Sequence, residues 1–242
     1  MKKEELSRAF IALSELLETL RSPGGCPWDA RQTDDTVKMY LLEEAYEVLD
    51  AVEKGDSGEL CGELGDLLFQ ILFLARLAEE RGEFDLLDVL QGITRKMRVR
   101  HPHVFGTLEL ESPEEVAENW ARIKKKEKAD LPSTANSLDS VPAALPALQA
   151  AHRLTERASR EGWRGPGGGV WEALNRELKD IKAFCAAGDK EKAGRRIGSL
   201  MFLLAHLAGT LGLNAEHLLR MTNRDFVRQF ERTCGAGKDS VD

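Results

Sequence analysis

The chain has 242 residues, with 34 Lys and Arg against 41 Asp and Glu, which gives a formal net charge of −7 at pH 7. This length accommodates one large domain or two small ones. The acidic balance argues against a protein that coats nucleic acid, because such proteins carry a basic surface. No apolar run approaches the length of a membrane span.

Apolar residues recur every three to four positions through most of the chain, which is typical of helices packed through one face. Alternating strand-like runs are absent, so the sequence predicts an all-α fold. In chain order, the expected helices cover residues 6–20, 41–52, 60–77, 86–99 and 200–213. Proline- and glycine-rich breaks fall at residues 22–25, 54–58, 101–103, 130–137 and 165–169.

The break at residues 130–137 is the best candidate for a linker between two domains. The four cysteines are scattered and form no Cys-x-x-Cys pair, which is typical of a reducing compartment. The N-terminus is amphipathic and has no apolar signal core, so we expect a cytoplasmic protein. The expected organisation is a first domain at residues 1–130, a linker at 131–141, a second domain at 142–235 and a disordered tail at 236–242.

Acidic residues gather on two adjacent predicted helices in the first domain. Residues three or four apart on a helix share a face, so Glu44 and Glu47 project together from the first helix. Glu43 shares a face with Glu47 in the same way, and Glu63 and Asp66 project together from the second helix. A turn that folds the helices back on each other would make these carboxylates converge. Oxygen ligands without His or Cys favour a hard cation such as Mg²⁺ or Mn²⁺.

A glutamate-rich helix face is often only a solvated surface. For Glu43, Glu44 and Glu47, a solvated surface and metal binding are equally good interpretations. The solvated surface fails for Glu63 and Asp66, whose neighbours in the sequence are apolar. Such neighbours predict burial, and a buried acid needs a partner. A cation held between the two helices would be that partner.

The helix pair recurs later in the chain at an offset of 133 residues (43 to 176 and 63 to 196). The helical pattern is repeated, but the acids are not. The replacements are Arg176 for Glu43, Arg196 for Glu63 and Ser199 for Asp66. Because two of these positions have become cationic and one carries a hydroxyl, the second copy is predicted not to hold a divalent cation.

Six motifs follow one another in the first half of the chain. They are Gly-Cys-Pro-Trp-Asp at 25–29, Gln-Thr at 32–33, Leu-Glu-Glu-x-x-Glu-Val-Leu-Asp at 42–50, Gly-Glu-Leu-Gly-Asp-Leu-Leu-Phe-Gln at 62–70, Arg-His-Pro-His-Val-Phe at 100–105 and Trp-x-x-x-Lys at 120–124. In this combination and order they resemble the MazG family of nucleoside triphosphate pyrophosphohydrolases, which are all-α enzymes. The similarity extends over nearly the whole chain.

The resemblance implies two tandem MazG-like helical bundles, the second degenerate, with catalysis in the first repeat. It implies hydrolysis of nucleoside or deoxynucleoside triphosphates to a monophosphate and pyrophosphate, with Mg²⁺ or alternatively Mn²⁺, as house-cleaning of the nucleotide pool. Carried over residue by residue, the metal ligands are Glu44, Glu47, Glu63 and Asp66, and Glu43 is a further catalytic residue that orients water or a ligand. The residues that match the family's nucleotide contacts are Trp28, Lys96, Arg100, Trp120 and Lys124.

Three alternatives to this interpretation differ in what they expect of the sequence. A ferritin-like di-iron bundle expects Glu-x-x-His on two helices, and the acidic helices contain none. The related phosphoribosyl-ATP pyrophosphohydrolases are disfavoured by the Cys-Pro-Trp-Asp and His-Pro-His-Val-Phe motifs. The third alternative is a regulatory or partner-binding helical protein with weak or modified-nucleotide hydrolase activity.

For partners, we expect a nucleoside triphosphate substrate and neither nucleic acid nor a membrane. We expect a homodimer, because a repeat of this kind buries its acidic helices best against another copy. A protein partner for the second repeat is the further alternative. The interface is expected to use the apolar stripe of Leu200, Phe202, Leu203, Leu207 and Leu211.

Overall fold

The computed structural model of the protein describes residues 2–129 and 137–235. These residues form helices joined by turns and loops, and they contain no strand. The predicted all-α fold is confirmed. The chain divides into two compact units, residues 1–130 (unit 1) and 131–242 (unit 2).

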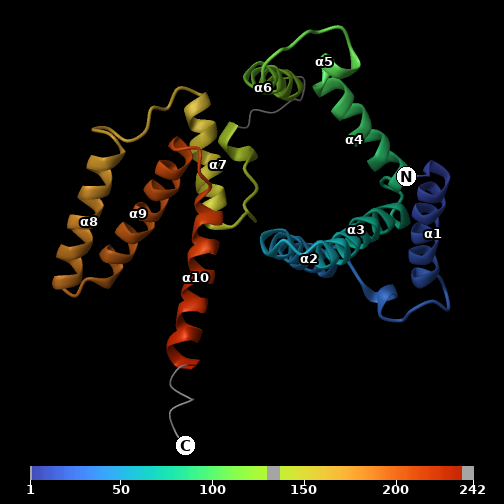
Figure 1. Ribbon diagram of the computed structural model, residues 1–242, viewed down its shortest axis with the longest axis horizontal. Helices are drawn as coiled ribbons and strands as arrows, with labels where there is room; N and C mark the ends of the chain where they lie inside the picture. The colour runs from blue at the N-terminus through green and yellow to red at the C-terminus, as the bar shows by residue number, and fades with distance from the viewer. Residues whose placement is uncertain (1, 130–136, 236–242) are drawn as a thin grey trace, which may run out of the picture. The chain divides into compact units, whose positions relative to one another are not determined.

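Helix α3 is the centre of unit 1, and α2 packs along it, as Figure 1 shows. Helix α1 packs against α3, and α4 contacts α3 before leading into α5. The described elements of unit 1 are α1 (Lys3–Arg21), η1 (Asp29–Arg31), α2 (Asp34–Lys54), α3 (Ser57–Glu80), α4 (Leu86–Arg100), α5 (Pro102–Phe105) and α6 (Pro113–Ala129).

A two-residue turn joins α2 to α3. Helix α2 ends at Lys54 and is capped by Gly55, whose φ of 75° lies in the left-handed region that glycine adopts without strain. The Asp56 side chain then caps α3 by accepting hydrogen bonds from the backbone N–H groups of Gly58 and Glu59, at 2.9 and 3.0 Å. The chain therefore reverses within two residues, so that the acidic stretches of the two helices come to lie side by side.

The hydrophobic core of unit 1 lies between α1, α2 and α3. Its buried members are Leu17, Val37, Leu72, Phe73 and Leu77. The buried residues of α3 all belong to its C-terminal half, from Leu72 to Ala78. The N-terminal half of α3, which carries the acids, therefore contains no fully buried residue, although it lies beside α2.

Unit 2 is built around a second helix pair, α8 and α9, with α7 packed on α9 and α10 contacting both α7 and α9. The α8–α9 turn resembles the α2–α3 turn: Gly188 has a φ of 71°, and Asp189 accepts a hydrogen bond from the backbone N–H of Lys192 at 3.1 Å. The described elements of unit 2 are η2 (Ser137–Ser140), α7 (Ala147–Arg160), α8 (Val170–Ala186), α9 (Lys190–Thr210) and α10 (Ala215–Gly235).

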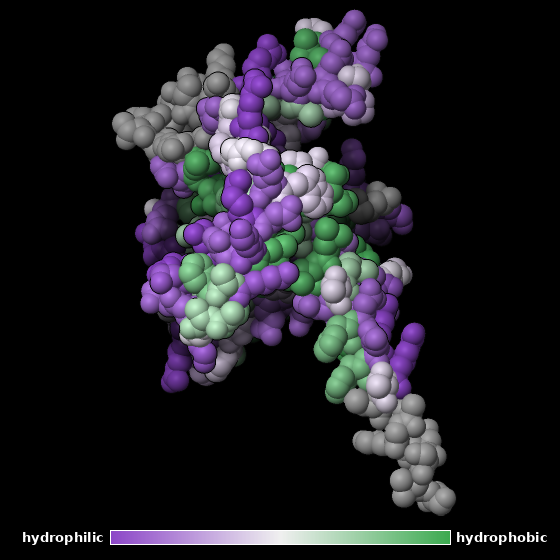
Figure 2. Space-filling view, turned by 90° about the vertical axis from the view of Figure 1, so that its left-hand side faces the viewer, coloured by the Kyte–Doolittle hydropathy of each residue, from purple (hydrophilic) through white to green (hydrophobic). Residues whose placement is uncertain are grey.

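The core of unit 2 consists mainly of small residues, with His206 buried among them. The His206 ring lies 4.7 Å from that of Trp163, centroid to centroid, and burial lowers the pKa of this histidine. Apolar side chains also reach the surface of unit 2, including along α10 (Figure 2). The exposed large apolar residues of α10 are Leu218, Leu219, Met221, Phe226, Val227 and Phe230.

Two of the predicted segments fall partly or wholly outside the described residues, namely residues 131–136 of the linker and the tail at 236–242. No single described helix is long and apolar enough to cross a membrane. One bent pair, Lys190–Thr210 with Ala215–Thr233, meets the length and composition criteria only when the two helices are taken together.

Candidate metal centre

Three carboxylates from α2 and α3 meet at one point. Ligand oxygens of Glu44, Glu63 and Asp66 all lie within 4.8 Å of one another. Mg²⁺ holds its ligands about 2.1 Å away, so oxygens on opposite sides of the ion are about 4.2 Å apart. The three acids are therefore gathered to nearly the spacing that such a cation needs.

The electrostatics of the cluster favour a bound cation or proton. Loss of hydration raises the pKa of Glu44, and the nearby charges of Asp66 and Glu47 raise it further. Loss of hydration also raises the pKa of Glu63, and Glu47 and Asp66 again add repulsion. Glu47 thus interacts with acids on both helices, so the structure brings all four predicted metal ligands together.

Glu43 lies outside this group. It is exposed on α2, and a helix turns about 100° per residue, so its side chain leaves the helix on a different side from that of Glu44. Its role in orienting water or a ligand stays a prediction.

The apolar neighbours of Glu63 and Asp66 predict burial, and this prediction is wrong. Glu63 is half-buried and Asp66 is exposed. The apolar residue between them, Leu64, is itself 49% exposed. The physical reason is that α1 packs on the other half of α3, so Leu64 and Asp66 are not covered from that side, whereas Leu68 and Phe69 still pack against the core.

Two of the predicted nucleotide contacts, Arg100 and Lys124, lie around the aromatic ring of a third, Trp120. The Lys124 ammonium nitrogen is 3.9 Å from the centroid of the Trp120 ring, and the Arg100 guanidinium carbon is 5.8 Å from it. Arg100 also pairs with Glu127, with Nη2 2.6 Å from Oε2. The Arg100 hydrogen bond lowers the pKa of Glu127, and the charges of Lys96 and Lys124 lower it further. Lys96 therefore belongs to the same cluster, on α4 and α6.

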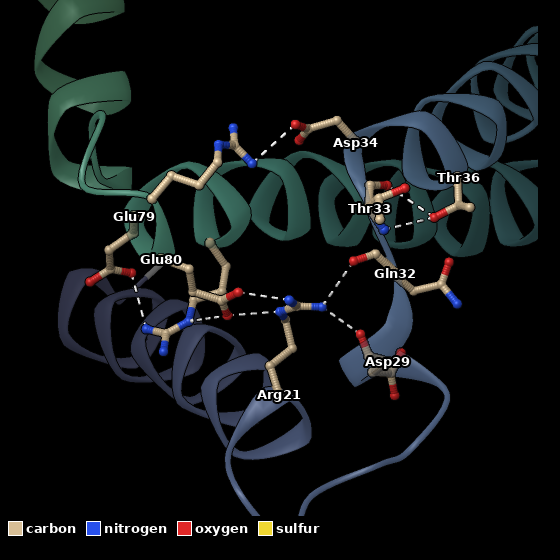
Figure 3. A network of polar contacts seen from close by, with 10 residues as sticks. Arg21, Asp29, Gln32, Thr33, Asp34, Thr36, Glu79 and Glu80 are labelled. Atoms are coloured by element: carbon tan, nitrogen blue, oxygen red, sulfur yellow. Dashed lines mark hydrogen bonds and ion pairs between the residues drawn. The ribbon is translucent and has the colours of Figure 1, made fainter.

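Trp28 lies in a different place, in the loop between α1 and α2. Arg21 anchors this loop by donating hydrogen bonds to the backbone oxygens of Asp29 and Gln32 while its guanidinium pairs with Glu80 of α3 (Figure 3). The Gln32 amide donates to the Trp28 carbonyl oxygen at 3.1 Å. The loop leads into the start of α2, about 15 Å along that helix from Glu44.

Trp28 itself is 65% exposed. The described contacts thus place the predicted site residues in three groups: the acids on α2 and α3, the cations with Trp120 on α4 and α6, and Trp28 in the anchored loop.

The comparisons with known proteins agree on a family. A profile described as the MazG nucleotide pyrophosphohydrolase domain matches residues 32–105. The chain is 40% identical over 225 residues to the nucleoside triphosphate pyrophosphohydrolase of Escherichia coli (strain K12), which covers 90% of this chain and 84% of that protein. It is 37% identical over 231 residues to the nucleoside triphosphate pyrophosphohydrolase/pyrophosphatase MazG of Thermotoga maritima, which covers 95% and 87%. The chain belongs to the MazG family.

The MazG profile includes the acid cluster together with Lys96 and Arg100, whereas Trp28, Trp120 and Lys124 lie outside residues 32–105. The structure adds Glu127, a residue that sequence reasoning missed. Its only signal in the sequence is helical spacing, since it follows Lys124 by three residues and so shares its face. The contact with Arg100 spans 27 residues and is apparent only in the three-dimensional structure.

Proposed function

We propose that unit 1 hydrolyses nucleoside triphosphates, deoxy forms included, to a nucleoside monophosphate and pyrophosphate. The observation that carries the proposal is the convergence of Glu44, Glu63 and Asp66 within 4.8 Å, with the pKa of the two glutamates raised. Membership of the MazG family supports the same reaction, since the relatives named above are called nucleoside triphosphate pyrophosphohydrolases.

The donor set fits a hard divalent cation, because it offers carboxylate oxygens alone. Mg²⁺ is the proposed cofactor, with Mn²⁺ as the alternative. Glu44, Glu63 and Asp66 would hold the cation, and Glu47 would be the fourth ligand. When bound, such a cation neutralises phosphate charge and lowers the pKa of a coordinated water.

The cluster around Trp120 supplies the groups that a triphosphate requires. The Arg100 guanidinium can hold two phosphate oxygens at once, and Lys96 and Lys124 add positive charge. The face of Trp120 can stack on a base once the cations have turned to the phosphates, which is worth roughly 1–3 kcal/mol by analogy with single-stranded nucleic acids. Because every base has an aromatic face, stacking predicts broad base specificity. Trp28 is the second candidate for stacking.

We further propose that the protein acts as a homodimer. Large apolar residues are exposed on α4, where they have no described partner, and contiguous exposed apolar surface marks interaction sites. In the predicted stripe, Phe202 on α9 and Leu211 just after it are exposed. Light scattering at micromolar concentration tests this, because a monomeric mass would exclude it. The exposed apolar residues of α4 are Leu87, Val89, Leu90, Ile93 and Val99.

The activity is tested with purified full-length protein and Mg²⁺ against the eight common ribo- and deoxyribonucleoside triphosphates, with products separated by anion exchange. Monophosphate plus pyrophosphate, lost in Glu63→Gln, would support the proposal and rank the substrates. If no substrate is cleaved with Mg²⁺ or Mn²⁺, the regulatory alternative gains weight. Release of inorganic phosphate without pyrophosphate would contradict the proposed bond cleavage.

A further inference from the structure

Unit 2 retains acids on α8 where unit 1 has them on α2. Residues of α8 and α9 correspond to residues of α2 and α3 at an offset of 133. Similar glycine–aspartate turns join the helices of each pair. Among the described residues, a group of three acids able to share an ion is found only on α2 and α3. The correspondences are Glu177 to Glu44, Asp180 to Glu47, Arg196 to Glu63 and Ser199 to Asp66.

Arg196 reaches across from α9 to both acids of α8. Its Nη1 donates to Glu177 Oε1 at 3.4 Å, and its Nε lies 3.4 Å from Asp180 Oδ2. The Glu177 side chain is only 16% exposed, and its second oxygen, Oε2, is buried without a hydrogen-bond partner. A guanidinium charge is therefore the counter-charge for this acidic pair.

We propose that Arg196 is a built-in counter-ion that takes the place of a divalent cation in unit 2. The inference rests on the metal centre proposed for unit 1, because that centre supplies the comparison. In unit 1 the acids of both helices repel one another and need an added ion. In unit 2 the second helix supplies a positive charge itself, so one of the two negative charges on α8 is offset without a metal.

Two consequences follow from the proposal. Each chain carries one metal centre, in unit 1, and unit 2 is indifferent to chelators. Substitutions could also create a metal site at the corresponding position in unit 2. Acids in place of Arg196 and Ser199 would produce four carboxylates on two helices with no cation among them. That donor set suits Mn²⁺ or Mg²⁺, and Glu177 Oε2 is already free to join it.

The test measures Mn²⁺ binding to the full-length chain by calorimetry. Wild type is expected to bind Mn²⁺ in unit 1, and Glu63→Gln/Asp66→Asn to lose that binding. Adding Arg196→Glu/Ser199→Asp to this background is expected to create one new Mn²⁺ site per chain. The matched control is Arg195→Glu/Ser199→Asp in the same background, which makes the same charge change on α9 but leaves the Arg196 counter-ion in place.

The outcomes separate the two proposals. Absence of Mn²⁺ binding by wild type would count against the proposed function of unit 1 and leaves the designed site in unit 2 to be measured by itself. A folded Arg196→Glu/Ser199→Asp variant that binds no Mn²⁺, or a control that binds equally well, would overturn the role of Arg196. Helical circular dichroism establishes that each variant is folded.

A second measurement tests the proposal if the designed variant does not fold. In a Trp28→Phe/Trp120→Phe background, fluorescence comes only from Trp163 and Trp171 and so reports on unit 2. The unfolding temperature of this signal is expected to be the same in EDTA and in Mg²⁺. Arg196→Gln is expected to lower it, and Arg196→Lys to restore part of the loss. A wild-type signal that shifts with Mg²⁺, or one that Arg196→Gln leaves unchanged, would overturn the proposal.

Discussion

Glu127 binds the guanidinium of Arg100 at two points, with Oε2 2.6 Å from Nη2 and Oε1 3.3 Å from Nε. The Arg100 side chain is only 10% exposed, so this pair is shielded from solvent on one side. A phosphate group would use the same two guanidinium donors. Glu127 therefore occupies the position at which we propose the substrate's phosphate binds.

The first prediction concerns this competition. Glu127→Gln keeps the size of the side chain but removes its charge, so a phosphate no longer competes with a carboxylate for Arg100. We expect KM for a deoxynucleoside triphosphate to fall by about tenfold, or about 1.4 kcal/mol, the lower end of the range for a hydrogen bond to a charged group. Glu118→Gln, an exposed change on the same helix, should leave KM unaltered. A raised KM in Glu127→Gln would show that the glutamate serves substrate binding instead.

The second prediction separates catalysis from folding at the acid cluster. Glu63→Gln removes one proposed ligand, so kcat should fall by about 100-fold or more, the scale of losing one preorganised electrostatic group. The same change relieves repulsion from Glu47 and Asp66, so the free energy of unfolding in EDTA should rise. Urea denaturation and steady-state kinetics on one preparation measure both. Glu79→Gln, on the C-terminal part of α3 beside Arg76, is the active control, and wild-type turnover in Glu63→Gln would place the site elsewhere.

The third prediction is a pH dependence of metal stabilisation. The pKa values of Glu44 and Glu63 are raised above 4.5 in the fold, so without metal the folded state binds protons more tightly than the unfolded state. Their contribution to stability is therefore favourable at low pH and lost as pH rises through the folded pKa values. Metal binding needs these groups deprotonated. Mg²⁺ should raise Tm more at pH 7.5 than at pH 5, and an equal rise at both would contradict the coupling.

The fourth prediction concerns the anchor of the Trp28 loop. The Arg21 side chain is 7% exposed and pairs with Glu80, so Glu80→Gln should destabilise the protein by about 2–3 kcal/mol, somewhat less than for a fully buried pair. Glu83→Gln, at the exposed Arg81 pair, should cost at most about 1 kcal/mol. Thermal or urea unfolding distinguishes the two.

The same pair has a pH signature. The hydrogen bond from Arg21 lowers the pKa of Glu80 below 4.5. Its contribution is therefore complete above the unfolded pKa and is lost as pH falls through the lowered one. The stability gap between wild type and Glu80→Gln should close on acidification, and a gap that persists at low pH would attribute it to packing.

Much of the acid cluster could be predicted from the sequence because it depends on local rules. Helical spacing places Glu44 with Glu47 and Glu63 with Asp66, and the glycine–aspartate turn brings the two helices together. Burial could not be predicted in the same way. Whether Asp66 is covered depends on how far α1 extends along α3, which the residues around Asp66 do not encode.

Two ion pairs could not be predicted from the sequence for the same reason. Arg21 and Glu80 are 59 residues apart, and Arg100 and Glu127 are 27 apart. Each residue alone resembles the many solvated charges of a chain that is 31% charged. Such pairs become visible only when the fold has brought distant helices together.

The core described above holds few large side chains, and of these only Leu17 and Val37 are fully buried among the described residues. In the proposed homodimer a second copy would cover more of the exposed apolar surface, and the stability gained in this way would follow mass action. The melting temperature should therefore increase with protein concentration. Dilution would therefore lower the stability of the fold. At low protein concentration the amount of folded enzyme would fall faster than the total amount of the protein.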